Sequence, residues 1–200
     1  EGRAVLLYHV ERMNEESANA LLKVMEEPPE GVLFLLTADS LAGVLPTIRS
    51  RCVSFAVAPV SPADCTRYCA AQGVDKKTAA LYSELFDGHI GTVLAVARDE
   101  ARAAQVEKAL ELARAAAARD SYTAAVLLAA YEKDKAAASA LLTDFRAVAA
   151  AGLRSSPRAP VQGTQARQAV RLADAALQRL GAQVNPKIVL SVFAAKFRAL

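Results

Sequence analysis

Three runs of consecutive apolar residues mark the first sixty positions of the chain. They cover Ala4–Val10, Gly31–Ala38 and Cys52–Val60. The first two runs lack polar alternation, which is typical of strands that are buried on both faces of a sheet, and the third run predicts a further strand. Segments with helical spacing lie between the runs, at about residues 14–27 and 41–51. The order strand, helix, strand, helix, strand predicts an open α/β sheet.

Residues at the ends of the first predicted helix define its bounds. Asn14 is a good N-cap, and the carboxylates of Glu15 and Glu16 suit the positive start of a helix. Pro28 and Pro29 cannot continue a helix, so we expect it to end before them.

The pattern changes after the third apolar run, because only helical spacing follows. Ser61 before Pro62 and Asn185 before Pro186 each predict an N-cap with proline at the first helical position. We expect the Ser- and Pro-containing loop at residues 152–163 to be mobile. The predicted helices are Ser61–Gln72, Asp75–Phe86, Gly91–Arg98, Glu100–Arg119, Tyr122–Ala151 with a break near residues 133–135, Pro160–Leu180 and a last one from Asn185.

Composition and charge narrow the class of protein. The chain has 200 residues, 54% of them hydrophobic, and a formal charge of +3, which neither demands nor excludes a nucleic acid partner. Residues 1–60 hold five basic and eight acidic residues, whereas residues 145–200 hold nine basic residues and one acid. We find no uncharged apolar window of membrane-spanning length and no signal peptide, so no membrane partner is expected. Since the chain lacks an initiator Met and starts almost directly in a strand, we interpret it as a fragment of a longer protein.

The cysteines indicate a reducing compartment, the cytoplasm. Cys52, Cys65 and Cys69 are odd in number and have no disulfide-framework spacing. Cys65 and Cys69 lie four residues apart in a predicted helix, but no further Cys or His is near enough in sequence to complete a tetrahedral site. We therefore expect no metal.

The main candidate for chemistry is Arg51, which stands between Ser50 and Cys52 at the end of a predicted short helix. Arg51 could cap the carbonyl groups of that helix, or it could reach a phosphate of another molecule. Glu26 and Glu27 end the preceding helix, where we favour packing or a contact with a neighbour over acid–base chemistry.

Other polar groups are weaker candidates. His9 follows a predicted strand, but the sequence places no nucleophile or orienting acid beside it, so we interpret it as structural. Arg154, Arg158, Arg167 and Arg171 predict a basic face. That face is a solvated surface, a contact for acidic partner helices or a contact for a nucleic acid, and the sequence does not separate these.

The segments "SANALLKVMEEPPEGVLFLLT" (Ser17–Thr37) and "LPTIRSRC" (Leu45–Cys52) resemble the clamp-loader branch of the AAA+ ATPases. The resemblance implies an α/β fold followed by an all-α part. Residues 1–60 would be the carboxyl-side part of an AAA+ sheet domain, 61–99 a small three-helix lid and 100–200 a helical collar bundle. It also places a further strand between those at Val32–Thr37 and Cys52–Ala58. If that further strand is absent, the strand at Cys52–Ala58 should be displaced, pair with another molecule or pair directly with Val32–Thr37.

Departures from the family pattern indicate which kind of subunit the chain resembles. Tyr8 and His9 stand where the ATPases carry Asp-Glu, and in "GHIG" Gly91 stands where they carry a nucleotide-contacting arginine. No phosphate-loop motif occurs in the chain. The chain therefore resembles subunits that hydrolyse no ATP and hold no cofactor of their own. By resemblance, Arg51, flanked by Ser50 and Cys52, is an arginine finger that acts in trans on a neighbouring ATPase.

The resemblance also implies partners. These are the gamma/tau and delta clamp-loader subunits, with the sliding clamp and primed DNA reached through the complex. Two alternatives remain open: an ATP-hydrolysing gamma/tau-type subunit or related replication ATPase, and a helical interaction protein whose resemblance is accidental.

Overall fold

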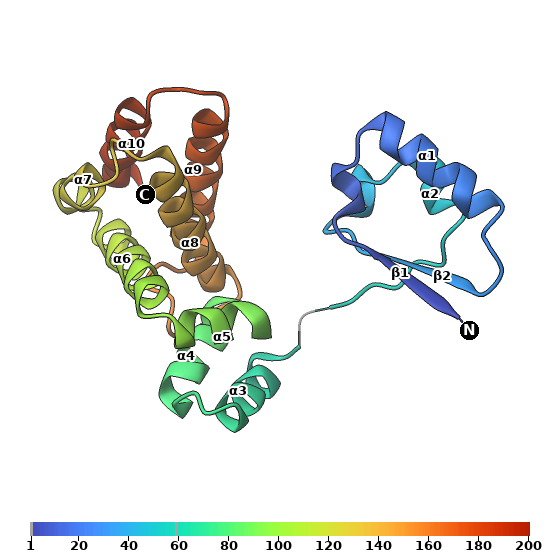
Figure 1. The fold of residues 1–200 in the computed structure, drawn as a ribbon. Helices are drawn as coiled ribbons and strands as arrows, with labels where there is room; N and C mark the ends of the chain where they lie inside the picture. The colour runs from blue at the N-terminus through green and yellow to red at the C-terminus, as the bar shows by residue number, and fades with distance from the viewer. Residues whose placement is uncertain (1, 59) are drawn as a thin grey trace. The chain divides into compact units, whose positions relative to one another are not determined.

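The computed structural model describes residues 2–58 and 60–200 (Figure 1). The chain divides into two compact units, the first ending at Ala58 and the second covering the rest. The first unit is α/β and the second is entirely helical among its described residues. The predicted fold class, α/β followed by all-α, is confirmed.

Two parallel strands form the sheet of the first unit. β1 (Arg3–Leu7) pairs with β2 (Val32–Leu36), and the register runs from Arg3 opposite Val32 to Leu7 opposite Leu36. The connecting segment contains the short 3-10 helix η1 (Val10–Arg12) and helix α1 (Glu15–Glu26). A second 3-10 helix, η2 (Leu41–Gly43), and the short helix α2 (Pro46–Arg49) follow β2.

One face of this sheet is covered and the other is open. Val10, Ala18, Val44 and Ile48 form a small core, against which apolar residues of α1 and the strand ends pack. On the opposite face Leu6, Leu33 and Leu35 are each about half exposed. The prediction that both strands are buried on both faces is therefore wrong for the part of the chain described. The sequence carried the apolar residues of both faces, but this unit supplies a cover for only one.

The third predicted strand, Cys52–Val60, does not form within residues 52–58 and 60; residue 59 lies outside the described residues. This segment is extended away from the sheet, and Val53, Phe55 and Val57 are 81%, 85% and 94% exposed. A strand needs a neighbour for its backbone N–H and C=O groups, and none is paired with this segment here. Its displacement is one of the outcomes expected for a strand without its usual neighbour.

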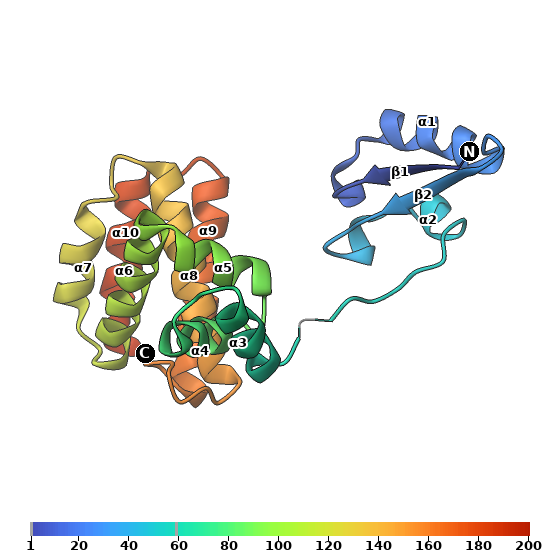
Figure 2. The same ribbon diagram turned by 60° about the horizontal axis from the view of Figure 1, so that its bottom comes forward.

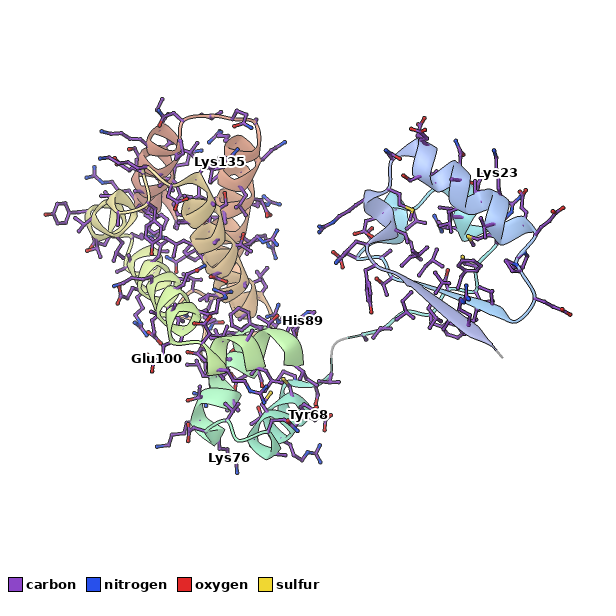
Figure 3. All side chains as sticks on the ribbon, viewed as in Figure 1. Lys23, Tyr68, Lys76, His89, Glu100 and Lys135 are labelled. Carbon is purple, nitrogen blue, oxygen red and sulfur yellow. The ribbon has the colours of Figure 1, made fainter. Side chains whose placement is uncertain are left out.

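The second unit begins with three short helices and continues as a bundle (Figure 2). α8 lies between α6 and α9, and α10 packs against α7 and α9. Figure 3 labels Glu100 and Lys135 at the starts of α6 and α8. The helices are α3 (Pro62–Ala71), α4 (Lys76–Leu85), α5 (Ile90–Arg98), α6 (Glu100–Ala117), α7 (Ser121–Ala129), α8 (Lys135–Leu153), α9 (Gly163–Gly181) and α10 (Pro186–Ala195), followed by the 3-10 helix η3 (Lys196–Ala199).

Local signals placed the starts of three helices correctly, whereas the helix predicted from Pro160 begins at Gly163. The side chain of Asn14 accepts a hydrogen bond from the Ser17 N–H at 2.8 Å, and Ser61 accepts one from Asp64 N–H at 3.1 Å. Asn185 caps α10 through the Lys187 N–H at 2.9 Å. The predicted break near residues 133–135 is also confirmed, because α7 and α8 are separate helices.

Helix α8 is the one described helix whose length and composition would allow it to cross a membrane, although half of it is buried inside the protein. Its Asp144 side chain is 4% exposed and forms an ion pair with Arg102 of α6. Arg102 donates two hydrogen bonds to the Asp144 carboxylate, and Gln105 Nε2 donates a third at 2.7 Å. Burial and a paired charge are typical of the core helix of a helical bundle.

The loop between α8 and α9 is anchored rather than free. The Arg154 Nε lies 3.1 Å from the Asp87 carboxylate, and Arg158 Nε donates to Glu84 at 3.2 Å. Ser156 Oγ donates to the same Glu84 carboxylate at 2.9 Å. These contacts fix the loop on the end of α4, so the sequence-based expectation of a mobile loop finds no support in its contacts.

Candidate functional site

Arg51 lies just beyond the carboxyl end of α2, where the sequence placed it. Its Nη1 group donates a hydrogen bond to the Thr47 carbonyl oxygen at 3.1 Å. This contact is the helix-capping role that the sequence left open for Arg51. The side chain is nevertheless 37% exposed, so part of the guanidinium faces solvent.

The other end of the guanidinium is held by Glu26. Arg51 Nη2 donates to Glu26 Oε1 in an ion pair, and the Glu26 side chain is itself half exposed. Glu26 is the last residue of α1, so the pair links the end of α1 to the end of α2. A planar, permanently charged guanidinium suits both this carboxylate and a phosphate.

The neighbours of Arg51 have mainly structural contacts. Ser50 is the C-cap of α2, and its hydroxyl donates to the Thr47 carbonyl at 3.0 Å. Cys52 is half buried against the small core of the first unit. Arg49, the last residue of α2, is exposed. Among these residues, the structure therefore gives only Arg51 a guanidinium held between a carboxylate and a carbonyl.

The residues that replace the expected ATPase groups occupy two separate units. Tyr8 follows β1 and is 68% exposed, and His9 follows it in a left-handed backbone conformation with φ 56°. Gly91 lies in the first turn of α5, and apart from its chain neighbours and the backbone of its own helix no atom lies within 4 Å of the position that a Cβ would occupy. Packing therefore does not require glycine at position 91.

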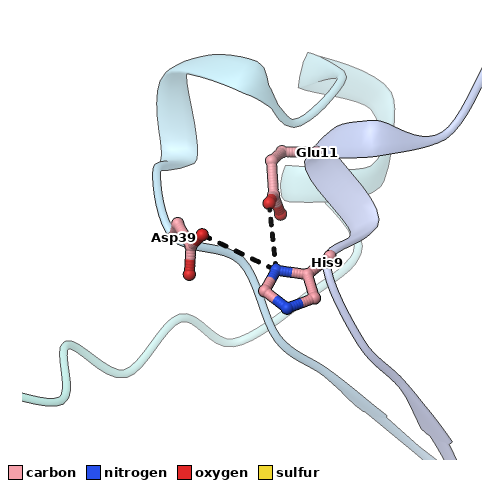
Figure 4. A group of neighbouring side chains, drawn as sticks. All are labelled: His9, Glu11 and Asp39. Atoms are coloured by element: carbon pink, nitrogen blue, oxygen red, sulfur yellow. Dashed lines mark hydrogen bonds and ion pairs between the residues drawn. The ribbon is translucent and has the colours of Figure 1, made fainter. Parts of the chain in front are cut away.

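His9, Glu11 and Asp39 come together beyond the carboxyl ends of β1 and β2 (Figure 4). His9 Nδ1 lies 3.3 Å from Glu11 Oε1 and 3.6 Å from Asp39 Oδ2. Desolvation raises the pKa of Glu11. Several effects outweigh this desolvation and hold the pKa of Glu11 below its usual value. They are hydrogen bonds from the Glu11 backbone and the His9 ring, the charge of that ring, and a hydrogen bond from the Asp39 backbone.

Sequence reasoning considered His9 alone and missed this group. The signal was the position of each residue just after a strand, because the carboxyl ends of parallel strands meet at one edge of a sheet. The close approach also needs the turn at His9, whose N–H donates to Thr37 Oγ1 at 3.3 Å.

The predicted basic face is divided by the structure. Arg154 and Arg158 pair with Asp87 and Glu84 of the same unit, as described above. Arg167 and Arg171 are exposed on α9. The first pair therefore has structural partners, and the second pair remains available for a solvated surface or a partner.

Cys65 and Cys69 are fully buried in the second unit, with their sulfur atoms 4.0 Å apart. Burial, together with the neighbouring Cys65 sulfur, raises the pKa of Cys69 to about 11. Both are free thiols. The expectation that they hold no metal stays a prediction.

Comparison with known sequences finds similarity in the part that holds this site. The model of a family described as "DNA polymerase III, delta subunit" matches residues 1–61. DNA polymerase III subunit delta' of Yersinia pestis is 42% identical over 66 residues, which are 33% of this chain and 19% of the relative. The corresponding subunit of Haemophilus influenzae is 52% identical over 50 residues, 25% of this chain and 15% of the relative.

Similarity extends to a second kind of subunit. DNA polymerase III subunit gamma of Buchnera aphidicola (subsp. Schizaphis graminum) is 37% identical over 62 residues, 31% of this chain and 17% of that protein. The matched segments thus span less than a fifth of the length of these curated relatives.

A solved structure is similar over nearly the whole chain. The DNA polymerase III gamma subunit-related protein of Thermotoga maritima superposes with a TM-score of 0.53 at 22% identity, covering 98% of this chain and 72% of that one. At this identity the likeness concerns the fold alone.

Proposed function

We propose that the chain acts as the non-hydrolysing delta-prime subunit of the DNA polymerase III clamp loader, because residues 1–61 match the family described above and are similar in sequence to delta-prime subunits. In this role it helps to load the sliding clamp onto primed DNA in the bacterial cytoplasm. Its partners would be the gamma/tau and delta subunits of the loader.

The observation that carries this proposal is the placement of Arg51. The guanidinium is partly exposed at the end of α2 and held by one exposed carboxylate, Glu26. A neighbouring subunit's γ-phosphate, with more negative charge than one carboxylate, could draw the guanidinium away from Glu26. An arginine supplied in trans is worth roughly 10³–10⁵ in rate in comparable nucleotide hydrolases.

The lack of the chain's own ATPase chemistry is part of the proposal. Tyr8 and His9 offer no pair of carboxylates after β1, and Gly91 offers no cation. Glu11 is close in sequence, but its Oε1 faces His9 and its side chain is 13% exposed. Phosphoryl transfer needs an acidic ligand for the nucleotide-bound metal and a water-orienting carboxylate at the two positions that Tyr8 and His9 occupy here, so we propose that catalysis takes place on the neighbour.

We also propose the division of labour along the chain. Residues 1–60 supply the arginine, residues 61–99 form the lid, and residues 100–200 form the collar that joins other subunits. The exposed apolar side chains of α10, Ile188 at 59% and Val192 at 39%, support a role of this helix in subunit contact. Arg167 and Arg171 would add contacts to acidic partner helices or to DNA.

The test uses the full-length protein reassembled with its ATPase partners, sliding clamp and primed DNA. Arg51→Ala should leave assembly near normal and reduce stimulated ATP turnover and clamp loading several-fold. Arg49→Ala, at the last residue of α2 and two positions before Arg51, is the matched control and should have much less effect. Unchanged loading by folded Arg51→Ala complexes would show that Arg51 is structural.

The similarity to gamma subunits favours one alternative, an ATP-hydrolysing gamma/tau-type subunit. ATP turnover by the isolated full-length protein distinguishes the two. Steady turnover that survives Arg51→Ala would support the gamma-type alternative and contradict a non-hydrolysing subunit.

A further inference from the structure

The group formed by His9, Glu11 and Asp39 has the spacing of metal ligands. Each residue offers one ligand atom, and these atoms all lie within 4.8 Å of one another. Two ligands each about 2.1 Å from a tetrahedral zinc ion are about 3.4 Å apart. The distances from His9 Nδ1 to the two carboxylate oxygens, 3.3 Å and 3.6 Å, bracket that value.

A second observation concerns the other oxygen of Glu11. Glu11 Oε2 is buried and has no hydrogen-bond partner among the described residues, and the side chain is 13% exposed. A buried carboxylate oxygen without a donor is costly. A cation bound to Oε1 of the same carboxylate would offset part of that cost, because its positive charge would lie close to Oε2. Arg12 is a poor substitute, because its Nε stands 3.7 Å from the opposite oxygen, Oε1, and its side chain is 71% exposed.

The surroundings hold the three side chains in place. The Val10 N–H donates to the Thr37 carbonyl at 3.0 Å, which ties the two strand ends together. Gly43 packs against Glu11, because a Cβ added at Gly43 would be 3.0 Å from the Glu11 Cβ. Figure 4 shows the imidazole ring turned toward both carboxylates.

We propose that His9, Glu11 and Asp39 bind one divalent transition-metal ion of the zinc type. One imidazole nitrogen and two carboxylate oxygens are three protein ligands, which leaves a fourth position for water. The imidazole favours Zn²⁺ over Mg²⁺, which prefers oxygen ligands and keeps its waters. The site lies outside the carboxyl ends of parallel strands, where α/β sheets bind ligands, and it does not depend on the clamp-loader role.

The competing explanation is that a protonated His9 simply forms ion pairs with the two carboxylates. The two explanations differ in a measurement on the 200-residue chain itself. Titration calorimetry with Zn²⁺ and the visible absorption of added Co²⁺ should show one saturable ion per chain with nitrogen and oxygen ligands. An ion-pair cluster would bind neither ion saturably, which would overturn the proposal.

Variants identify the ligands. His9→Ala, Glu11→Gln and Asp39→Asn should each weaken Zn²⁺ binding at least about tenfold, since removal of outer-sphere partners alone costs that much. His89→Ala removes the other histidine and should change nothing. Arg12→Ala should bind Zn²⁺ as tightly or more tightly, and circular dichroism without metal checks that every variant is folded.

Three results would refute this assignment. Binding that survives all three ligand substitutions would place the ion elsewhere. Binding lost on Cys52→Ser, with a cobalt–thiolate band in the wild-type spectrum, would show that the thiol is the ligand. Mg²⁺ in place of Zn²⁺ should give weak binding, and equal affinity for the two ions would contradict an imidazole ligand.

Discussion

Arg51 forms an ion pair with Glu26, and this contact joins the two sequence motifs that distinguish the chain. The "EEPP" end of α1 and the "SRC" end of α2 lie 25 residues apart in sequence at these two side chains. Glu26 therefore belongs to the arginine site. The sequence favoured packing or a contact with a neighbour for Glu26 and Glu27. The structure shows that Glu26 pairs with Arg51 of the same chain.

The strength of this pair can be measured in the chain. Both side chains are partly exposed, so water and salt screen their attraction. A double-mutant cycle of Glu26→Gln and Arg51→Ala should give a coupling of about 0.2–1 kcal/mol. Amide hydrogen exchange in α2 provides the readout for the first unit. Glu27→Gln is the control, and an equal coupling of Glu27 to Arg51 would contradict the observed geometry.

Glycines at positions 91 and 88 should respond oppositely to alanine. Gly91 lies in a helix with open space around its Cβ position, so Gly91→Ala should stabilise the second unit by about 0.4–1 kcal/mol through the unfolded chain. Gly88 has φ +71°, and a Cβ there would lie 1.8 Å from the Val60 carbonyl oxygen. Gly88→Ala should lower the melting temperature clearly, and equal effects of the two changes would be inconsistent with this packing.

The buried carboxylate of Asp144 should be important for the bundle. Hydrogen bonds from Arg102 and Gln105 offset the free-energy cost of burying this carboxylate. The hydrogen bond with Asp144 also raises the pKa of Arg102. Asp144→Ala leaves these donors without their acceptor and should cost about 2–3 kcal/mol of unfolding free energy, measured by urea denaturation. Arg146→Ala breaks a half-exposed pair with Asp174 and should cost less than about 1 kcal/mol.

The thiols should differ in reactivity and in their effect on pH stability. Cys52 is half buried and should react with a thiol reagent at pH 8, whereas buried Cys65 and Cys69 should react only on unfolding. Desolvation raises the pKa of Cys69 from 9.0 to about 11, so between these values the unfolded chain releases a proton that the folded chain keeps. Stability should therefore fall as pH rises through this window, and Cys69→Ala should reduce that dependence.

The extended segment after α2 should make the chain prone to self-association. Val53, Phe55 and Val57 are exposed in an alternating pattern that suits pairing with another strand. Replacing all three by Ser should lower light scattering at high concentration and leave α1 and α2 intact. Tyr122→Ser, which removes an exposed side chain of the second unit, is the control. Scattering that persists in the triple variant and disappears in the control would show that another surface mediates self-association.

The sequence by itself determined the helices, because their signals act over a few residues. Asn14, Ser61 and Asn185 each bond a backbone N–H two or three positions away, so the caps could be identified without any tertiary contact. The double proline and the motif around Arg51 likewise identified the family pattern of residues 1–61, which the comparisons then supported.

Only the tertiary structure decided the features that need distant partners. The apolar run after Cys52 has the composition of a strand, but strand formation requires a neighbouring backbone, which the described chain does not provide. Arg158 is fixed by Glu84, 74 residues away, which anchors a loop that its own sequence marked as mobile. His9 and Asp39 meet because β1 and β2 pair in parallel and bring their ends to one edge of the sheet. Spacing along the chain does not contain such pairings, because they depend on how the strands pair and how the helices pack.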